Sequence, residues 1–129
     1  MKIYISGQIS STDDYMERFE TAEKKLTEQG YSVINPAKVN AQMPEDTSYD
    51  EYMEMSETML KQADVIYMLK GWELSNGANT EFAWALEWGK MIMFEDVRYI
   101  AEAFEVINAA ERSKNKYAYK IGSKVALNK

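Results

Sequence analysis

The sequence predicts an α/β fold in which a parallel sheet of four or five strands carries helices on both faces. Short segments rich in β-forming residues alternate with longer segments whose apolar residues recur every three or four positions. This alternation is typical of a parallel sheet, because each crossover helix returns the chain to the same end of the sheet. With 129 residues and 46% hydrophobic composition, the chain suffices for one domain with one core.

The first elements are strongly marked. A strand is expected at residues 2–6, and Gly7 opens a polar loop before a helix. The apolar face of this helix follows a 4-3-4 spacing, formed by Tyr15, Phe19, Ala22 and Leu26. A short second strand is predicted at residues 31–35, and Pro36 stops it.

The middle of the chain contains a second strand–helix alternation. Residues 37–47 have no clear period, so we expect a long loop there. Ser48 and Glu51 have the spacing of a capping box, which predicts the start of a helix. The apolar run at residues 64–69 predicts a buried third strand, and the helix after it is expected to end at Gly89.

The last part of the chain is less regular. A fourth strand is predicted at residues 91–94, followed by a helix lined by Ile100, Phe104 and Ile107. Residues 112–129 form a basic tail or edge segment, in which residues 116–121 could add an edge strand, pack on a partner subunit or fray. The whole pattern, residues 1–129, indicates a single domain of flavodoxin-like or Rossmann-like shape.

The charge is unevenly distributed. Residues 111–129 hold six of the 15 Lys and Arg and one acid, so this tail carries +5 and the remainder −11 of a net −6. An acidic body argues against binding to duplex nucleic acid, which requires a basic face.

Two residue types are missing from the sequence. With no His and no Cys, the usual neutral-pH base and any thiolate nucleophile, disulfide or thiolate metal site are excluded. Carboxylates, tyrosines and hydroxyls must do any chemistry. No stretch approaches the roughly 20 apolar residues of a membrane span, so we expect a cytoplasmic protein without a membrane partner.

Glu81 is the most informative candidate for a functional residue. It lies one turn inside a helix that follows the loop at the carboxyl end of the third strand, where open α/β sheets bind ligands. Trp84, Ala85 and Trp88 lie at 3-4 spacing from Glu81, which gives its carboxylate a largely apolar surrounding. The alternative is a solvated helix acid such as Glu87.

Two loop-to-helix junctions could hold a phosphate. The loop after Gly7 and the junction at residues 75–78 both follow carboxyl ends of strands, so their backbone N–H groups should converge. Neither a Walker sequence nor a G-x-G-x-x-G run is present, and an ordinary polar turn is the alternative. Tyr4 could reach the same cleft or be a packed core tyrosine, and Trp72 could stack on a base or cover the sheet end.

At these residues the chain resembles the nucleoside 2-deoxyribosyltransferase-like superfamily, over roughly residues 2–94. The nearest branch resembles a phage and bacterial domain family of unknown function, related to 2′-deoxynucleoside 5′-monophosphate N-hydrolases. The resemblance rests on Lys2-Ile3-Tyr4-Ile5-Ser6-Gly7-Gln8-Ile9, Asn35-Pro36, residues 63–69, Gly71-Trp72, Ser75-Asn76-Gly77-Ala78 and Glu81.

The resemblance implies specific roles. Glu81 would be the nucleophile that attacks C1′ of a deoxyribose, and the Tyr4 hydroxyl would orient it. Ser75 matches the serine of the monophosphate hydrolases, which favours a 5′-phosphate. The substrate-binding residues would be Gly7, Gln8, Ile9, Ser10, Ser56, Trp72, Ser75 and Gly77.

Two positions depart from the enzymes of the superfamily. Ser10 replaces an arginine that is common in the phosphate loop. Ser56 replaces an aspartate that contacts or protonates the leaving base, and a serine does not donate that proton readily. Asp50, Glu54 or Glu57 could replace this acid only if the helix register brings one into the cleft.

The resemblance and these residues together predict an N-glycosidase or deoxyribosyl transferase, which acts on (deoxy)nucleoside 5′-monophosphates through a covalent glutamate intermediate. This chemistry requires neither metal nor cofactor. The alternatives are a nucleotide-binding protein that sequesters or senses its ligand and, less well supported by the pattern from Ser75 to Glu81, a pure interaction module. A homodimer or larger homo-oligomer is also expected, through exposed aromatic residues: Tyr49, Tyr52, Trp84 and Trp88.

Overall fold

The computed structural model describes residues 1–9, 13–96 and 125–127. Over these ranges the chain forms a five-stranded, entirely parallel sheet in the order β2-β1-β3-β4-β5. The strands are β1 (Lys2–Ser6), β2 (Ser32–Ile34), β3 (Val65–Met68), β4 (Met91–Phe94) and β5 (Val125–Leu127). The α/β prediction is confirmed, with five strands in the sheet.

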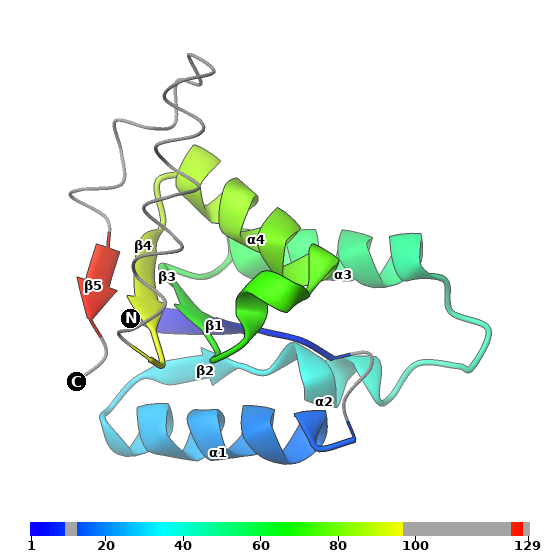
Figure 1. Cartoon of the computed structure of the whole chain (residues 1–129), viewed down its shortest axis with the longest axis horizontal. Coiled ribbons are helices and arrows are strands. Elements are labelled where there is room, and N and C mark those ends of the chain that lie inside the picture. The colour runs from blue at the N-terminus through cyan, green and yellow to red at the C-terminus, as the bar shows by residue number, and fades with distance from the viewer. Residues whose placement is uncertain (10–12, 97–124, 128–129) are drawn as a thin grey trace.

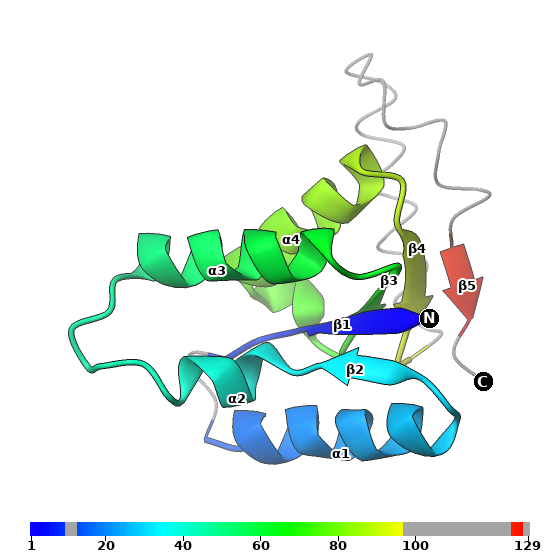
Figure 2. The same cartoon turned by 180° about the vertical axis from the view of Figure 1, so that it is seen from behind.

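Helices cover both faces of this sheet. The helical elements are α1 (Tyr15–Glu28), α2 (Pro36–Asn40), α3 (Tyr49–Lys61), the 3₁₀ turn η1 (Trp72–Leu74) and α4 (Asn76–Glu87). Both views of the ribbon show α1 on one side of the sheet and α3 with α4 on the other (Figures 1 and 2). None of the helices in the described ranges has the length and apolar character needed to cross a membrane.

The sheet separates the core into two layers, and β1 contributes to both because its successive side chains point to opposite faces. Ile3 and Ile5 join the apolar cluster under α1, which also contains Phe19 and Leu26. Tyr4 joins the cluster under α3 and α4. The candidate active site lies next to this second layer.

Residues 37–47 are not entirely a loop, as the sequence had led us to expect. Pro36 begins the short helix α2, and Asn35 caps it: its side-chain oxygen accepts hydrogen bonds from the N–H groups of Ala37 and Lys38 at 3.0 and 3.3 Å. Asparagine at the cap followed by proline in the first turn is a regular helix start. The pair Asn35-Pro36 carried this signal, but helix α2 is too short for a hydrophobic period to reveal it.

The other helix boundaries agree with the sequence prediction. The capping box forms at the start of α3, where the Ser48 hydroxyl accepts from the Glu51 N–H at 3.1 Å and the Glu51 carboxylate accepts from the Ser48 N–H at 3.0 Å. Gly89 follows α4 with φ of 68°, in the left-handed region that favours glycine. The helix expected around Ile100 to Ile107 and the segment 116–121 lie outside the described residues, and β5 is an edge strand beside β4.

Candidate active site

A cavity of about 720 Å³ opens between α3, the amino end of α4 and the loop that follows β1. Its position at the carboxyl ends of β1 and β3 is where parallel sheets of this kind bind ligands. The described residues that line it come from five segments: Gly7, Gln8 and Ile9; Tyr15; Asn40 and Ala41; Tyr49, Tyr52, Met53 and Ser56; and Leu74, Ser75, Asn76, Gly77, Ala78 and Glu81.

Glu81 lies at the inner wall of this cavity, and both of its carboxylate oxygens are hydrogen-bonded. The Tyr4 hydroxyl donates to Oε2, and the Ser6 hydroxyl donates to Oε1 at 2.6 Å. Glu81 is 6% exposed, while Tyr4 and Ser6 are fully buried. Tyr4 and Ser6 are two residues apart on β1, so the pleat places both hydroxyls on the face that α4 covers.

Burial dominates the electrostatics of this pair. Removal from water raises the pKa of Glu81, and hydrogen bonds from Ser6, Tyr4 and Ser56 lower it only in part. Burial and the neighbouring Glu81 raise the pKa of Tyr4 well above its usual value, so Tyr4 is a neutral donor at physiological pH. Glu81 therefore takes up a proton more readily than an exposed glutamate does, whereas Tyr4 keeps its own proton and donates a hydrogen bond.

The amino end of α4 forms the second part of the site. Ser75 is its N-cap, and the Ser75 hydroxyl accepts from the N–H of Ala78 at 3.1 Å. The following residues Asn76, Gly77 and Ala78 line the cavity, so the positive end of the helix dipole faces it. A helix start of this kind favours a negatively charged group.

Gly7 is explained by packing. A Cβ atom at this position would lie 2.8 and 2.9 Å from side-chain carbons of Leu69, which is too close for any other residue without a shift of the chain. The loop after β1 thus needs glycine so that it can pass over the end of β3. Gln8 and Ile9 line the cavity as predicted for the loop, and Ser10 lies outside the described residues.

Ser56 lies where the sequence placed it. It is 5% exposed, lines the cavity from α3, and its side chain interacts with both Tyr4 and Glu81. Glu81 is the only acid among the described residues that line the cavity. The helix register does not bring in a replacement acid, because Glu57 pairs with Lys61 at 3.1 Å, and Asp50 and Glu54 are exposed away from the lining.

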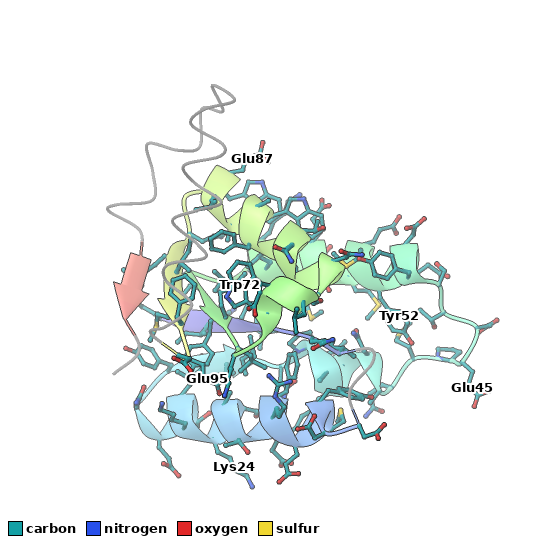
Figure 3. The ribbon with its side chains drawn as sticks, viewed as in Figure 1. Lys24, Glu45, Tyr52, Trp72, Glu87 and Glu95 are labelled. Atoms are coloured by element: carbon teal, nitrogen blue, oxygen red, sulfur yellow. The ribbon has the colours of Figure 1, made fainter. Side chains whose placement is uncertain are left out.

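Trp72 does not belong to the site, and the prediction that it binds substrate is wrong. It is 1% exposed and packs against Phe82 and Phe94, with ring centroids 4.8 and 6.4 Å away. Figure 3 shows Trp72 between α4 and the sheet, well apart from Tyr52, which lines the cavity. The 3₁₀ turn after Gly71 directs this indole inward, which the sequence of a loop does not indicate.

Several residues of the site were not predicted from the sequence. Ser6 has a recognisable signal, because it lies two positions after Tyr4 on the same strand face. Asn40 has none, since α2 was not predicted; its side-chain oxygen is buried and lacks a hydrogen-bond partner among the described residues. Tyr49 and Tyr52 line the cavity as well, where aromatic rings can contact a planar base.

The residues of this site lie in a part of the chain that matches a protein family. The sequence profile of the domain of unknown function DUF4406 matches residues 1–94, which include every described residue of the site. The chain belongs to this family. A comparison with curated proteins gives no match.

Solved structures share the fold at low sequence identity. A 2-deoxyribosyltransferase from Bacillus psychrosaccharolyticus is 20% identical, with a TM-score of 0.61 over 73% of this chain and 71% of that one. The CMP N-glycosidase BcmB from Clostridium botulinum is 24% identical, with a TM-score of 0.53 over 77% and 74% of the two chains. The protein BlsM is 18% identical, with a TM-score of 0.63 over 86% and 74%. The fold of this DUF4406 chain is therefore that of nucleoside deoxyribosyltransferase-like proteins.

Proposed function

We propose that this protein is an N-glycosidase or deoxyribosyltransferase that acts on the base–sugar bond of (deoxy)nucleoside 5′-monophosphates. The observation that carries the proposal is a buried carboxylate, Glu81, held through both oxygens by neutral hydroxyls at the wall of a ligand-sized cavity. The fold neighbours include a deoxyribosyltransferase and a CMP N-glycosidase, which supports this class of chemistry.

In the proposed first step, one oxygen of Glu81 forms a bond to C1′ while the C1′–N bond breaks. The bonding electrons leave on the base nitrogen, and a glycosyl ester remains on Glu81. In the second step water attacks C1′, and the ester oxygen returns to Glu81 as carboxylate. The hydroxyl of water stays on the sugar, and the remaining proton of water goes to the nitrogen of the departed base. If a second base attacks C1′ in place of water, the reaction is transfer instead of hydrolysis.

The phosphate and the base would occupy different walls of the cavity. We place the 5′-phosphate at the amino end of α4, near Ser75 and the N–H of Gly77, with the loop from Gly7 to Ile9 beside it. The base would lie against Tyr52 of α3, because the Tyr49 hydroxyl lies beside Gly77, 3.6 Å from the position of a Cβ atom there. This arrangement leaves C1′ of the sugar facing Glu81.

A substrate panel and a trapped intermediate test this function. Wild-type protein is incubated with each deoxynucleoside and ribonucleoside 5′-monophosphate and the matching nucleosides, and free base is measured by liquid chromatography. Mass spectrometry of acid-quenched reactions should find a deoxyribosyl phosphate adduct on the peptide that contains Glu81. The control is Glu87→Gln, which neutralises an exposed acid on the same helix; this variant should release base at the wild-type rate.

A second candidate function is a nucleotide-binding protein without turnover. The observation that favours it is Ser56, since Glu81 is the only carboxylic acid among the described lining residues and no second carboxyl group there can protonate a departing base. Calorimetric binding of a nucleotide with no release of base over many hours would support this candidate and exclude the glycosidase.

A homo-oligomer stays a proposal, but the structure exposes fewer of the aromatic residues on which it was based. Of the four aromatic residues expected to be exposed, only Tyr49 is, at 59%. Tyr52 is half-buried, and Trp84 and Trp88 are stacked 5.7 Å apart and packed partly against the core. Light scattering at micromolar concentration tests the proposal: a mass near 14.9 kDa would contradict it.

A further inference from the structure

The last residue of β1, Ser6, provides a hydroxyl at the buried end of the site. It is fully buried and donates its hydrogen bond to Oε1 of Glu81 at 2.6 Å. Its backbone is fixed as well, because its carbonyl accepts from the N–H of Leu69 at 2.8 Å and Ser6 pairs with Met68 in the sheet. The sheet itself therefore sets the position of this hydroxyl.

We propose that Ser6 is a positioning residue, which fixes the second oxygen of Glu81 and thereby sets the plane of the carboxylate toward the sugar. The inference rests on the proposed function and deepens it. A carboxylate held at one oxygen by Tyr4 can still turn about its last bond, because terminal torsions of glutamate are broad. A second anchor on the opposite oxygen removes this freedom, and an oriented nucleophile reacts faster.

The same hydrogen bond favours the ionised form of Glu81. A donor to a carboxylate favours its charged form, and Ser6 gives the largest of the three contributions that lower the pKa of Glu81 against the effect of burial. The other two come from Tyr4 on β1 and Ser56 on α3, and no Lys or Arg of the described residues contributes. Loss of the Ser6 hydroxyl should therefore raise the pKa of Glu81 further.

The ordinary alternative is that Ser6 is only a buried hydroxyl that needs an acceptor. Such a structural role predicts a change in stability without a change in the titration of Glu81. Three variants separate the two readings: Ser6→Ala removes the hydroxyl, Ser6→Thr keeps it, and Ser6→Val has the shape of threonine without the hydroxyl. Thr58→Val is the control, because it removes a hydroxyl that donates to a backbone carbonyl on the exposed side of α3.

The kinetic test uses the nucleotide that wild type cleaves best. Ser6→Ala and Ser6→Val should lower kcat roughly 10- to 100-fold, the effect of losing one hydrogen bond to a charged group. KM should stay within about twofold, since Ser6 does not line the cavity among the described residues. The acid limb of the kcat profile should move to higher pH, and Ser6→Thr should restore both rate and profile.

A measurement without turnover keeps this test independent of the proposed function. The carboxyl carbon of Glu81 is titrated by ¹³C NMR in protein labelled at the glutamate side chains, with its resonance assigned by loss in Glu81→Gln. Ser6→Ala should titrate at higher pH than wild type, while Ser6→Thr and Thr58→Val should not.

The outcomes separate the two proposals. Unchanged titration of Glu81 in Ser6→Ala, or equal behaviour of Ser6→Thr and Ser6→Val, would overturn the role of Ser6 whatever the activity. If wild type cleaves nothing in the panel, the proposed function fails, and the NMR titration still decides whether Ser6 controls the Glu81 carboxylate.

Discussion

The two faces of strand β1 show how one short segment serves both stability and the site. On the face under α1, Ile3 and Ile5 pack into an apolar cluster with Phe19 and Leu26. On the face under α3 and α4, Tyr4 and Ser6 direct hydroxyls at the buried carboxylate of Glu81. The first face gains stability from burying apolar area, whereas the second also buries a charge, which is unfavourable unless it is well hydrogen-bonded. The second face therefore contributes less to stability than the first, and under the proposed function it carries the chemistry.

The largest expected effect tests the chemical role of the polar face. Glu81→Gln should lower the rate of base release by at least about 10⁴-fold, because the amide is a poor nucleophile. Nucleotide binding measured by calorimetry should remain, since the amino end of α4 is unchanged. Glu87→Gln serves as the matched control, and wild-type rates in Glu81→Gln would remove Glu81 from the mechanism.

A gain of function at Ser56 is the next largest effect. Ser56→Asp should raise kcat by about 10²–10⁴-fold, the usual contribution of a general acid. The new carboxyl would lie beside Glu81 in a buried place, so that one of the two acids should retain a proton to donate. Ser56→Asn has a similar shape without that proton and should give no gain. Nucleotide binding without turnover in every variant would favour the sequestering protein.

Truncation on the α1 face should affect stability alone. Phe19, 1% exposed, packs in the apolar cluster, so Phe19→Ala should lower the free energy of unfolding by about 3–5 kcal/mol. At a temperature where the variant stays folded, kcat should be near that of wild type. Phe82→Ala is the counterpart under α4, and we expect it to lower both stability and kcat, because Phe82 supports the helix that carries Glu81. Equal losses of kcat in both variants would end the distinction between the faces.

Two helix caps provide a smaller and closely matched test. Ser48 and Ser75 each accept a backbone N–H at 3.1 Å, so either change to alanine should lower the free energy of unfolding by about 1 kcal/mol. Only Ser75→Ala should raise KM, and more for a nucleoside monophosphate than for the nucleoside. Identical KM values in the two variants would move the phosphate away from α4.

The smallest effect concerns the pH dependence of stability. Because the folded-state pKa of Glu81 is raised, its favourable contribution is complete below the unfolded-state pKa and is lost as pH rises through the folded-state pKa. Relative to Glu81→Gln, wild type should therefore lose stability from acidic to neutral pH in urea denaturation. Glu23 and Glu51 have lowered pKa values and act with the opposite sign, but they are common to both proteins and cancel in the comparison. A constant difference between the two proteins would contradict the raised pKa.

Local patterns in the sequence were sufficient for most of the framework. The 4-3-4 spacing from Tyr15 to Leu26 and the capping box at Ser48 predicted α1 and the start of α3, because these signals depend on neighbours within one or two turns. Alternation of strands and helices predicted the parallel sheet. The predicted topology placed Tyr4 and Glu81 near the same end of that sheet, and the resemblance to the superfamily implied that the Tyr4 hydroxyl orients Glu81.

Tertiary structure decided the features that depend on distant contacts. Trp72 lies in the core because it packs against Phe82 and Phe94, and the loop sequence around Trp72 does not indicate these contacts. Likewise, Ser6 is an ordinary strand residue until α4 brings Glu81 within 2.6 Å, and Asn40 reaches the cavity only through a helix too short to show a period. The sequence by itself therefore determined the layers and the main acid of this protein. The second anchor of that acid and the walls of the cavity were decided by packing between residues as many as 75 positions apart.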